Sequence, residues 1–148
     1  MAGIELIVTQ PDITTGTSLK TLLQIVAAAQ HRVKVKGWGI FCKGIVTTDA
    51  PLLVALVRQS TAGTMSANTP QKKDTAVAET LQTTAQHTAT VEPTITSTLK
   101  SIDVHPQSGF SEFFPLGSEI IMVGGSRLGL VVTAGVSISA TPFFDIEE

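Results

Sequence analysis

Apolar and polar residues alternate along several short stretches of this chain, and this alternation restricts the fold more than any other feature of the sequence. Valine and lysine alternate over residues 33–36, and residues 88–104 and 136–141 repeat the alternation with Thr and Ser in the polar positions. Successive side chains of a β-strand point to opposite faces, so residues two apart share a face. The pattern therefore predicts half-buried β-strands.

Turn-forming residues separate these segments at regular intervals, and together they predict about eight antiparallel strands. Within 148 residues this spacing is typical of an all-β domain, either a β-sandwich or a barrel. The Gly-Gly-Ser run at 124–126 predicts a tight hairpin turn between strands at 119–123 and 128–133. Residues 68–74 are polar and contain a proline, and we expect a loop there.

Three segments allow more than one interpretation. Residues 17–29 fit either a helix or a strand, and residues 76–85, which are small and polar, fit a short helix or an irregular loop equally well. Residues 4–9 form a short apolar run ended by a proline, which fits an edge strand or an arm. We expect an N-terminal arm over residues 1–16 and a single β-sandwich domain over residues 17–148.

Charged residues are scarce, at 15% of the chain with a net charge of −2, whereas about 25% is usual. Threonine, serine, alanine and glycine take their place. Lysine and arginine are scattered, with small groupings at 32–36 and 72–73, and tyrosine is absent. Because nucleic-acid binding normally needs a basic stripe and stacking aromatics, we expect no nucleic-acid partner. Low charge fits a β protein that another molecule partly covers.

The single cysteine, Cys42, excludes an internal disulfide and is expected to be a small buried apolar residue. The N-terminus lacks the basic segment and long apolar core of a signal peptide. Charged residues and glycines interrupt the longest apolar stretches, so we expect no membrane-spanning helix. Synthesis in the cytoplasm and no membrane association are the expected setting.

Residues that could carry chemistry occur without the patterns that chemistry needs. His31, His87 and His105 have no second His or Cys at ligand spacing. Asp, His and Ser lie close together over 103–111, but without a nucleophile-elbow motif. The glycine-rich run at 124–129 precedes a strand pattern, whereas a phosphate site needs a helix to follow. We expect no catalytic residue, cofactor or metal, and a structural or binding protein instead of an enzyme.

Two pairs of adjacent phenylalanines, Phe113 with Phe114 and Phe143 with Phe144, lie in the last third of the chain. Because neighbours on a strand face opposite sides, at least one ring of each pair should point away from the core, unless the pair lies at a sheet corner. An outward-facing ring favours a partner surface. These four residues are therefore candidates for an interface.

Several short motifs follow one another in a fixed order over most of the chain. They are Thr-Leu-Leu-Gln-Ile at 21–25, His-Arg-Val-Lys-Val at 31–35 leading to Gly-Trp-Gly-Ile at 37–40, Glu-Pro-Thr at 92–94, Val-His-Pro-Gln-Ser-Gly at 104–109 before an aromatic run, Pro-Leu-Gly at 115–117, Arg-Leu-Gly-Leu at 127–130 and Ile-Glu-Glu at 146–148. In this order the region from Thr21 to the C-terminus resembles the small capsid decoration, or cement, proteins of tailed bacteriophages. The resemblance favours a strand at 21–26 and does not extend to residues 1–16.

The resemblance implies a jelly-roll-like β-sandwich that assembles as a homotrimer on the outer capsid surface of the virion and binds the major capsid protein. Such proteins have no catalytic residues. As capsid contacts we expect Ile4, Leu6 and Ile7 in the N-terminal segment, together with Lys72 and Lys73. Avidity over a symmetric lattice would give such weak contacts their strength.

Two other functions are open at this stage. A carbohydrate- or receptor-binding β-sandwich module of a phage tail or spike would need exposed rings for stacking, and Trp38 is the only tryptophan. An enzyme built on a cupin-like barrel would need clustered His and Glu ligands, which the sequence lacks.

Overall fold

The structure is a computed structural model that describes residues 3–44 and 49–148, and every described element of secondary structure is a strand. The thirteen strands are β1 (Glu5–Thr9), β2 (Ile13–Thr14), β3 (Lys20–Val26), β4 (Val33–Lys43), β5 (Leu52–Gln59), β6 (Thr64–Asn68), β7 (Gln71–Lys72), β8 (Thr84–Val91), β9 (Ile95–Val104), β10 (Gly109–Phe113), β11 (Ile120–Met122), β12 (Arg127–Thr133) and β13 (Ser139–Glu147). Over the described ranges, no helix is long and apolar enough to cross a membrane.

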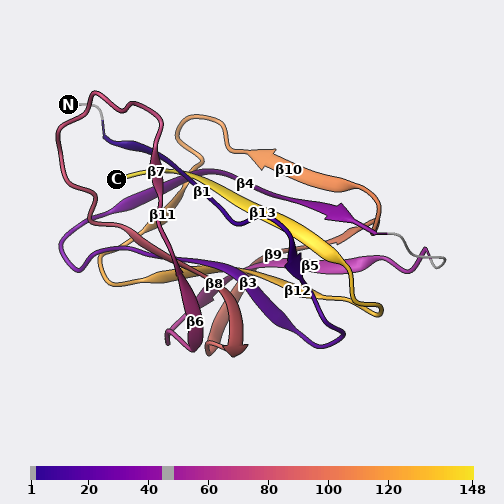
Figure 1. Ribbon diagram of the computed structural model, residues 1–148. Helices are drawn as coiled ribbons and strands as arrows, with labels where there is room; N and C mark the ends of the chain where they lie inside the picture. The colour runs from indigo at the N-terminus through magenta and orange to yellow at the C-terminus, as the bar shows by residue number, and fades with distance from the viewer. Residues whose placement is uncertain (1–2, 45–48) are drawn as a thin grey trace.

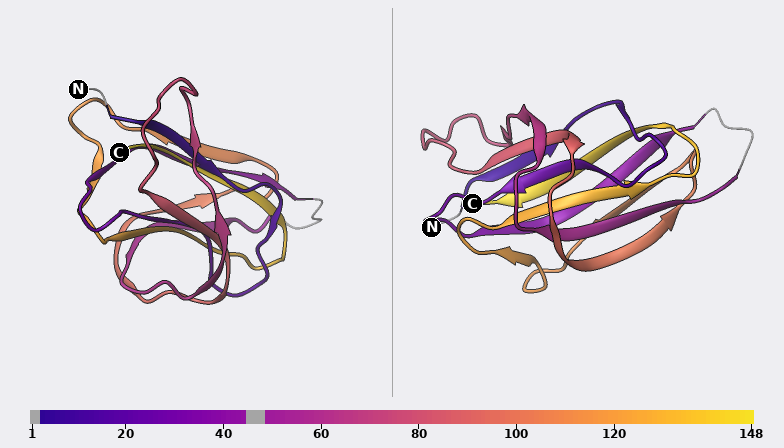
Figure 2. Two further views of the ribbon diagram at one scale, coloured as in Figure 1. Left: turned by 60° about the vertical axis from the view of Figure 1, so that its left-hand side comes forward. Right: turned by 90° about the horizontal axis from the view of Figure 1, so that it is seen from below.

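Two antiparallel sheets pack face to face as a β-sandwich, which confirms the predicted all-β fold (Figures 1 and 2). One sheet has the strand order β10-β4-β13-β1-β7, with β11 also paired to β4 and β2 to β13. The other has the order β6-β8-β3-β12-β5-β9. Eight of these strands form the framework of the sandwich, namely β1, β3, β4, β5, β9, β10, β12 and β13. When they are numbered 1 to 8 along the chain, the two sheets have the orders 1-8-3-6 and 2-7-4-5, the topology of a jelly roll.

The hydrophobic core lies between the two sheets. Trp38 in β4 and Phe144 in β13 are paired in register and fully buried. They face leucines of the other sheet, of which Leu56, Leu128 and Leu130 are also fully buried. Each large buried side chain of this kind stabilises the fold by about 1.5–3 kcal/mol relative to exposure.

The N-terminal segment belongs to the sandwich, so the expected separate arm over residues 1–16 is wrong. Strand β1 pairs along its length with β13 and on its other side with β7, and β2 also pairs with β13. Leu6 and Val8 on β1 are fully buried. The backbone amide of Ile4 donates to the carbonyl of Glu148 at 2.9 Å, which joins the two ends of the chain. The alternation in this short run reflects a strand that closes the core.

The hairpin predicted around residues 124–126 is also wrong. Strand β11 pairs with β4 in one sheet and β12 pairs with β3 and β5 in the other, so the turn crosses between the sheets. The amide of Gly125 donates to the carbonyl of Ala27 at 3.0 Å, and the amide of Ala27 donates to the carbonyl of Ser126 at 3.0 Å. The glycines thus let this turn lie against the connection between β3 and β4.

The remaining ambiguous segments are resolved as follows. The strand favoured at 21–26 is confirmed by β3, and residues 92–94 separate β8 from β9. Residues 76–83 form an irregular loop and not a helix. Within the expected loop at 68–74, residues 71–72 instead form the short strand β7, which extends the sheet beyond β1.

Candidate docking surface

Three phenylalanines on adjacent strands cover the outer face of the seven-stranded sheet. Each is the direct cross-strand neighbour of a glycine. Phe113 pairs with Gly37, Phe143 pairs with Gly39, and Phe41 pairs with Gly109. The three rings therefore belong to β10, β13 and β4, which lie side by side in the sheet.

Each ring lies over its partner glycine. A Cβ atom added to Gly37, Gly39 or Gly109 would overlap the ring that covers it. Glycine weakens a strand because it has no side chain to pack, and an aromatic ring from the neighbouring strand replaces the missing contacts. The sequence therefore supplies glycine where the rings must lie flat against the backbone.

The three rings form one continuous patch, here called the aromatic face and defined by Phe41, Phe113 and Phe143. The ring centroids of Phe41 and Phe143 are 6.0 Å apart with planes 11° from parallel, and those of Phe113 and Phe143 are 6.2 Å apart. Phe113 is 60% exposed and Phe41 is 53% exposed. The rings support one another while much of their area meets solvent, which is typical of a docking surface.

The prediction that one ring of each adjacent pair faces outward is confirmed. Phe143 lies on the outer face and Phe144 is fully buried in the core. Phe113 is exposed, whereas Phe114 is half-buried and packs against the core. Two of the four candidates therefore belong to the aromatic face, and the sequence analysis missed its third member, Phe41. The signal for it was present, because Phe41 is the outward residue between buried Ile40 and Cys42.

A network of ion pairs lies beside the aromatic face on the same sheet. The Lys36 ammonium bridges the carboxylates of Glu5 and Glu147, with a distance of 2.9 Å to Glu147, and Lys73 bridges Glu5 at 3.6 Å and Asp145 at 2.6 Å. The hydrogen bonds with Glu5 and Glu147 raise the pKa of Lys36 above its ordinary value. The hydrogen bond from Lys36 lowers the pKa of Glu147. The network links β1, β4 and β13 with Lys73, the residue that follows β7, at their outer surface.

The five residues expected to contact the capsid are placed differently by the structure. Ile4 and Leu6 are buried in the core and present no surface, so they are wrong as contact residues. Ile7 is 39% exposed on the outer face of the seven-stranded sheet. Lys73 is committed to the ion-pair network, and Lys72 donates to the carbonyls of Val77 and Glu79, with 2.9 Å to Val77.

A chain of hydrogen bonds that the sequence analysis did not foresee lies on the six-stranded sheet. Arg127 donates to the Gln24 side-chain oxygen at 3.4 Å, Gln24 donates to Gln59 at 2.7 Å, and Gln59 donates to the Thr21 hydroxyl at 2.9 Å. The backbone amide and hydroxyl of Thr21 both donate to the Glu92 carboxylate, at 2.8 and 2.7 Å. Thr21 and Gln24 are fully buried. Because each side chain finds a partner, their burial carries little cost.

Two connecting segments cover this polar chain. The amide of Ser60 donates to the carbonyl of Thr94, and the amide of Thr94 donates to the hydroxyl of Thr61, both at 2.9 Å. Gln24 also donates to the carbonyl of Thr61 at 3.2 Å. The motifs at 21–25, 92–94 and 127–130 thus meet in one place and fix the connections that leave β5 and β8.

Two of the residues that could carry chemistry, His105 and Cys42, have surroundings that the structure describes. His105 lies 3.4 Å from the Asp49 carboxylate on an exposed surface, and its ring accepts from the amide of Gln107. Burial raises the pKa of the Cys42 thiol to about 11, which makes its thiolate scarce near neutral pH. Within residues 3–44 and 49–148, no three His, Cys, Asp or Glu side chains are placed to hold a metal ion.

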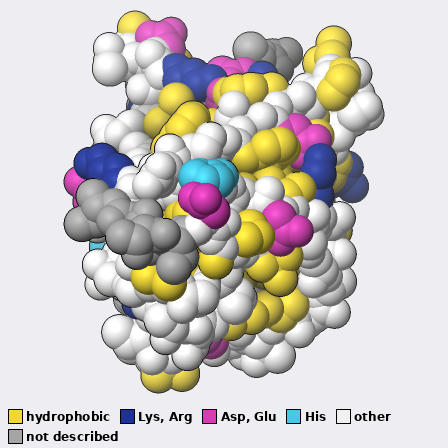
Figure 3. All heavy atoms as spheres, turned by 90° about the vertical axis from the view of Figure 1, so that its right-hand side faces the viewer, with side chains coloured by type: hydrophobic (Ala, Val, Ile, Leu, Met, Phe, Trp, Pro, Cys, Tyr) yellow, Lys and Arg dark blue, Asp and Glu magenta, His cyan; other side chains and the backbone are white. Residues whose placement is uncertain are grey.

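Uncharged surface predominates on the side of the molecule seen in Figure 3, where hydrophobic side chains reach solvent in several patches between isolated charges. This distribution matches the low charged fraction of the sequence. Comparison of the chain with models of known protein families, with curated proteins and with solved structures returns no match.

Proposed function

We propose that this chain is a structural virion protein, a capsid decoration protein that binds the outer surface of the capsid as a homotrimer and stabilises the head of a tailed bacteriophage. The observation that carries the proposal is the aromatic face, three rings that lie over glycines on one sheet, with Phe41 and Phe113 more than half exposed. A surface whose rotamers are already fixed loses little side-chain entropy on binding. The order of motifs along the chain supports the same function.

In a homotrimer, symmetry excludes packing of the aromatic face against the same face of a second copy, which supports a contact with the capsid. If the same face of two copies packed together, the contact would be isologous and would give a two-fold dimer. A trimer needs two different complementary surfaces on each copy. The aromatic face is then free to bind the major capsid protein, with Ile7 and the ion-pair network beside it.

Attachment to a capsid makes modest contacts sufficient. Three copies of the aromatic face in one trimer would engage neighbouring capsid subunits together, so that the loss of one contact does not release the trimer. The rings already pack against one another and need no rearrangement to dock. The ion pairs and the closely paired chain ends give the sheet that would face the shell a fixed shape.

The alternative function, carbohydrate binding, depended on an exposed Trp38, and the structure does not expose this residue. Trp38 is fully buried, its ring packs 5.4 Å from that of Phe110, and its indole N–H donates to the Glu112 carboxylate at 3.1 Å. It presents no ring on which a sugar could stack.

Two measurements test the proposal. Light scattering at micromolar concentration should give about three times the 15.5 kDa mass of the chain. The purified protein should also sediment with capsid shells assembled from the major capsid protein encoded in the same genome. A monomer that stays in the supernatant would reject the proposal.

A further inference from the structure

A leucine projects from a rigid turn between β10 and β11. Leu116 is 94% exposed. The amide of Ser118 donates to the carbonyl of Pro115 at 2.9 Å, and Gly117 has a φ of +89°, as the third position of a type II turn requires. The amide of Gly117 also donates to the Glu119 carboxylate at 2.7 Å. The turn therefore holds Leu116 in solvent in a fixed position.

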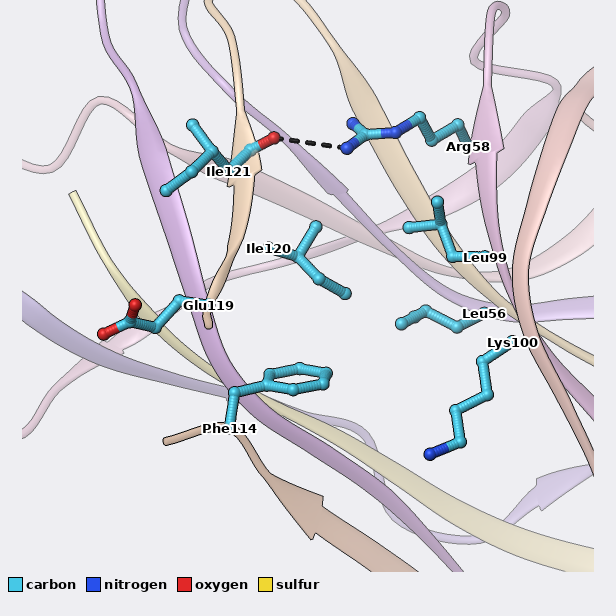
Figure 4. Close-up of a pocket in the computed structure, with 8 residues that line it drawn as sticks. All are labelled: Leu56, Arg58, Leu99, Lys100, Phe114, Glu119, Ile120 and Ile121. Carbon is cyan, nitrogen blue, oxygen red and sulfur yellow. Dashed lines mark hydrogen bonds between the residues drawn. The ribbon is translucent and has the colours of Figure 1, made fainter. Parts of the chain in front are cut away.

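A groove of about 480 Å³ lies next to this turn, and three of its eight lining residues are charged, namely Arg58, Lys100 and Glu119. Leu56 and Leu99 reach it from the six-stranded sheet, and Phe114 and Ile120 from the other (Figure 4). At one end Arg58 donates to the carbonyl of Ile121 at 3.3 Å and links the two sheets across it. The groove has room for a leucine side chain.

The occupant is not an added β-strand, although β9 lies at the sheet edge beside the groove. The pairing of β9 with β5 shifts register twice, between Leu56 and Val57 and between Arg58 and Gln59. Bulges of this kind twist an edge and interrupt its row of free backbone groups, and a lysine on the edge opposes pairing further. Lys100 occupies such a position on β9 and forms an ion pair with Glu112 at 2.6 Å.

We infer that the groove receives Leu116 from a second copy of the chain, which in turn accepts Leu116 from a third, so that a closed ring forms. The inference rests on the proposed homotrimer and names its interface. Leu116 lies in solvent in its own chain although the groove begins two residues before it and resumes three residues after it. The projection and the groove lie side by side on each copy, and a head-to-tail contact that seats the projection of one copy in the groove of the next is the kind of contact that a cyclic trimer requires.

Disulfide trapping tests this contact directly. In the double variant Leu99→Cys, Leu116→Cys, mild oxidation should link the copies head to tail, giving trimers on a non-reducing gel. The matched control, Leu53→Cys with Leu116→Cys, places the second thiol on β5, where Leu53 is 45% exposed away from the groove. It should give no covalent trimer. Cys42 is buried and should not interfere.

Solution mass is the second readout. Leu116→Asp should weaken self-association by about tenfold or more, because each contact loses the burial of a leucine. Leu19→Asp, at a residue 44% exposed near the start of β3, should leave the mass unchanged. Fluorescence from buried Trp38 reports that each variant is folded.

The outcomes separate this inference from the proposed function. A wild-type trimer that persists in Leu116→Asp, or a disulfide confined to one chain, would overturn the inference and leave the proposed function in place. A wild-type monomer would overturn both. The inference would be supported if Leu99→Cys with Leu116→Cys gave covalent trimers, the Leu53→Cys control gave none, and Leu116→Asp were monomeric.

Discussion

Phe143 and Gly39 are direct partners across β13 and β4, and the phenyl ring occupies the space in which a Cβ of residue 39 would stand. The substitution Gly39→Ala should therefore push the ring off the sheet, and we expect a loss of about 1 kcal/mol in the free energy of unfolding. The control is Gly135→Ala, where an added Cβ meets nothing within 4 Å. Urea denaturation measures both. Equal midpoints would contradict the seating of the ring on the glycine.

Removal of residues 1–10 should unfold the protein. The deletion removes β1, which pairs with β13, and with it the side chains of Leu6 and Val8, which are fully buried in the core. It also exposes the edge of β13, a site for aggregation. Circular dichroism and the soluble yield measure the effect. A stable, soluble truncated protein would mean that this segment is a dispensable arm after all.

Acid should weaken the ion pairs around Lys36. The hydrogen bond from Lys36 lowers the folded pKa of Glu147 below its ordinary value of 4.5, so the stabilisation is present above that pH and is lost as the pH falls through the lowered pKa. Because the side chains are partly exposed, we expect less than about 1 kcal/mol. Thermal melts at pH 7 and pH 3 should show a larger drop for wild type than for Glu147→Gln. Glu79→Gln, at an exposed carboxylate, should behave like wild type.

The polar chain on the six-stranded sheet should be sensitive to the loss of one member. Gln59→Leu removes one of the two hydrogen-bond partners of the buried Gln24 amide and of the Thr21 hydroxyl, at a cost of about 1 kcal/mol. Gln30→Ala, at an exposed residue, should change the unfolding free energy little. If Gln59→Leu were as stable as wild type, the hydrogen bonds would be incidental to the fold.

The thiol of Cys42 should be inert in the folded protein. Burial raises its pKa to about 11, so at pH 8 both access and thiolate are limiting. A colorimetric thiol reagent should react within minutes in denaturant and only at the rate of unfolding without it. Rapid reaction of the thiol in the native protein would contradict the burial of Cys42 on β4.

Local sequence predicted those features that depend on alternation. The outward rings of Phe113 and Phe143 follow from adjacent side chains of a strand facing opposite sides. Alternation left residues 17–29 open between a helix and a strand, and the strand predicted at 21–26 rested on the resemblance. The pairing of residues 5–9 with β13 could not be predicted, because the partner lies at the far end of the chain. The hydrogen bonds of Gln24 and Gln59 could not be predicted either, because their partners are also distant in the sequence. Polar side chains on a strand are expected to face solvent unless other segments cover them.

The hairpin error has a different cause. Two glycines between apolar strands allow a tight turn, but the turn chemistry does not say whether the strands pair with each other. Met122 and Leu128 both point into the core from opposite sheets, and the chain crosses the sandwich between them. The chain therefore crosses from one sheet to the other at this turn because both side chains are buried in the core.

The proposed function depends on binding of the capsid by the aromatic face. Its most direct test is the fraction of protein that sediments with capsid shells for wild type, Phe113→Ser and Leu53→Ser, a residue exposed on the other sheet. We expect saturable binding for wild type and Leu53→Ser, and about tenfold weaker binding for the folded Phe113→Ser protein. Equal binding by all three would contradict it.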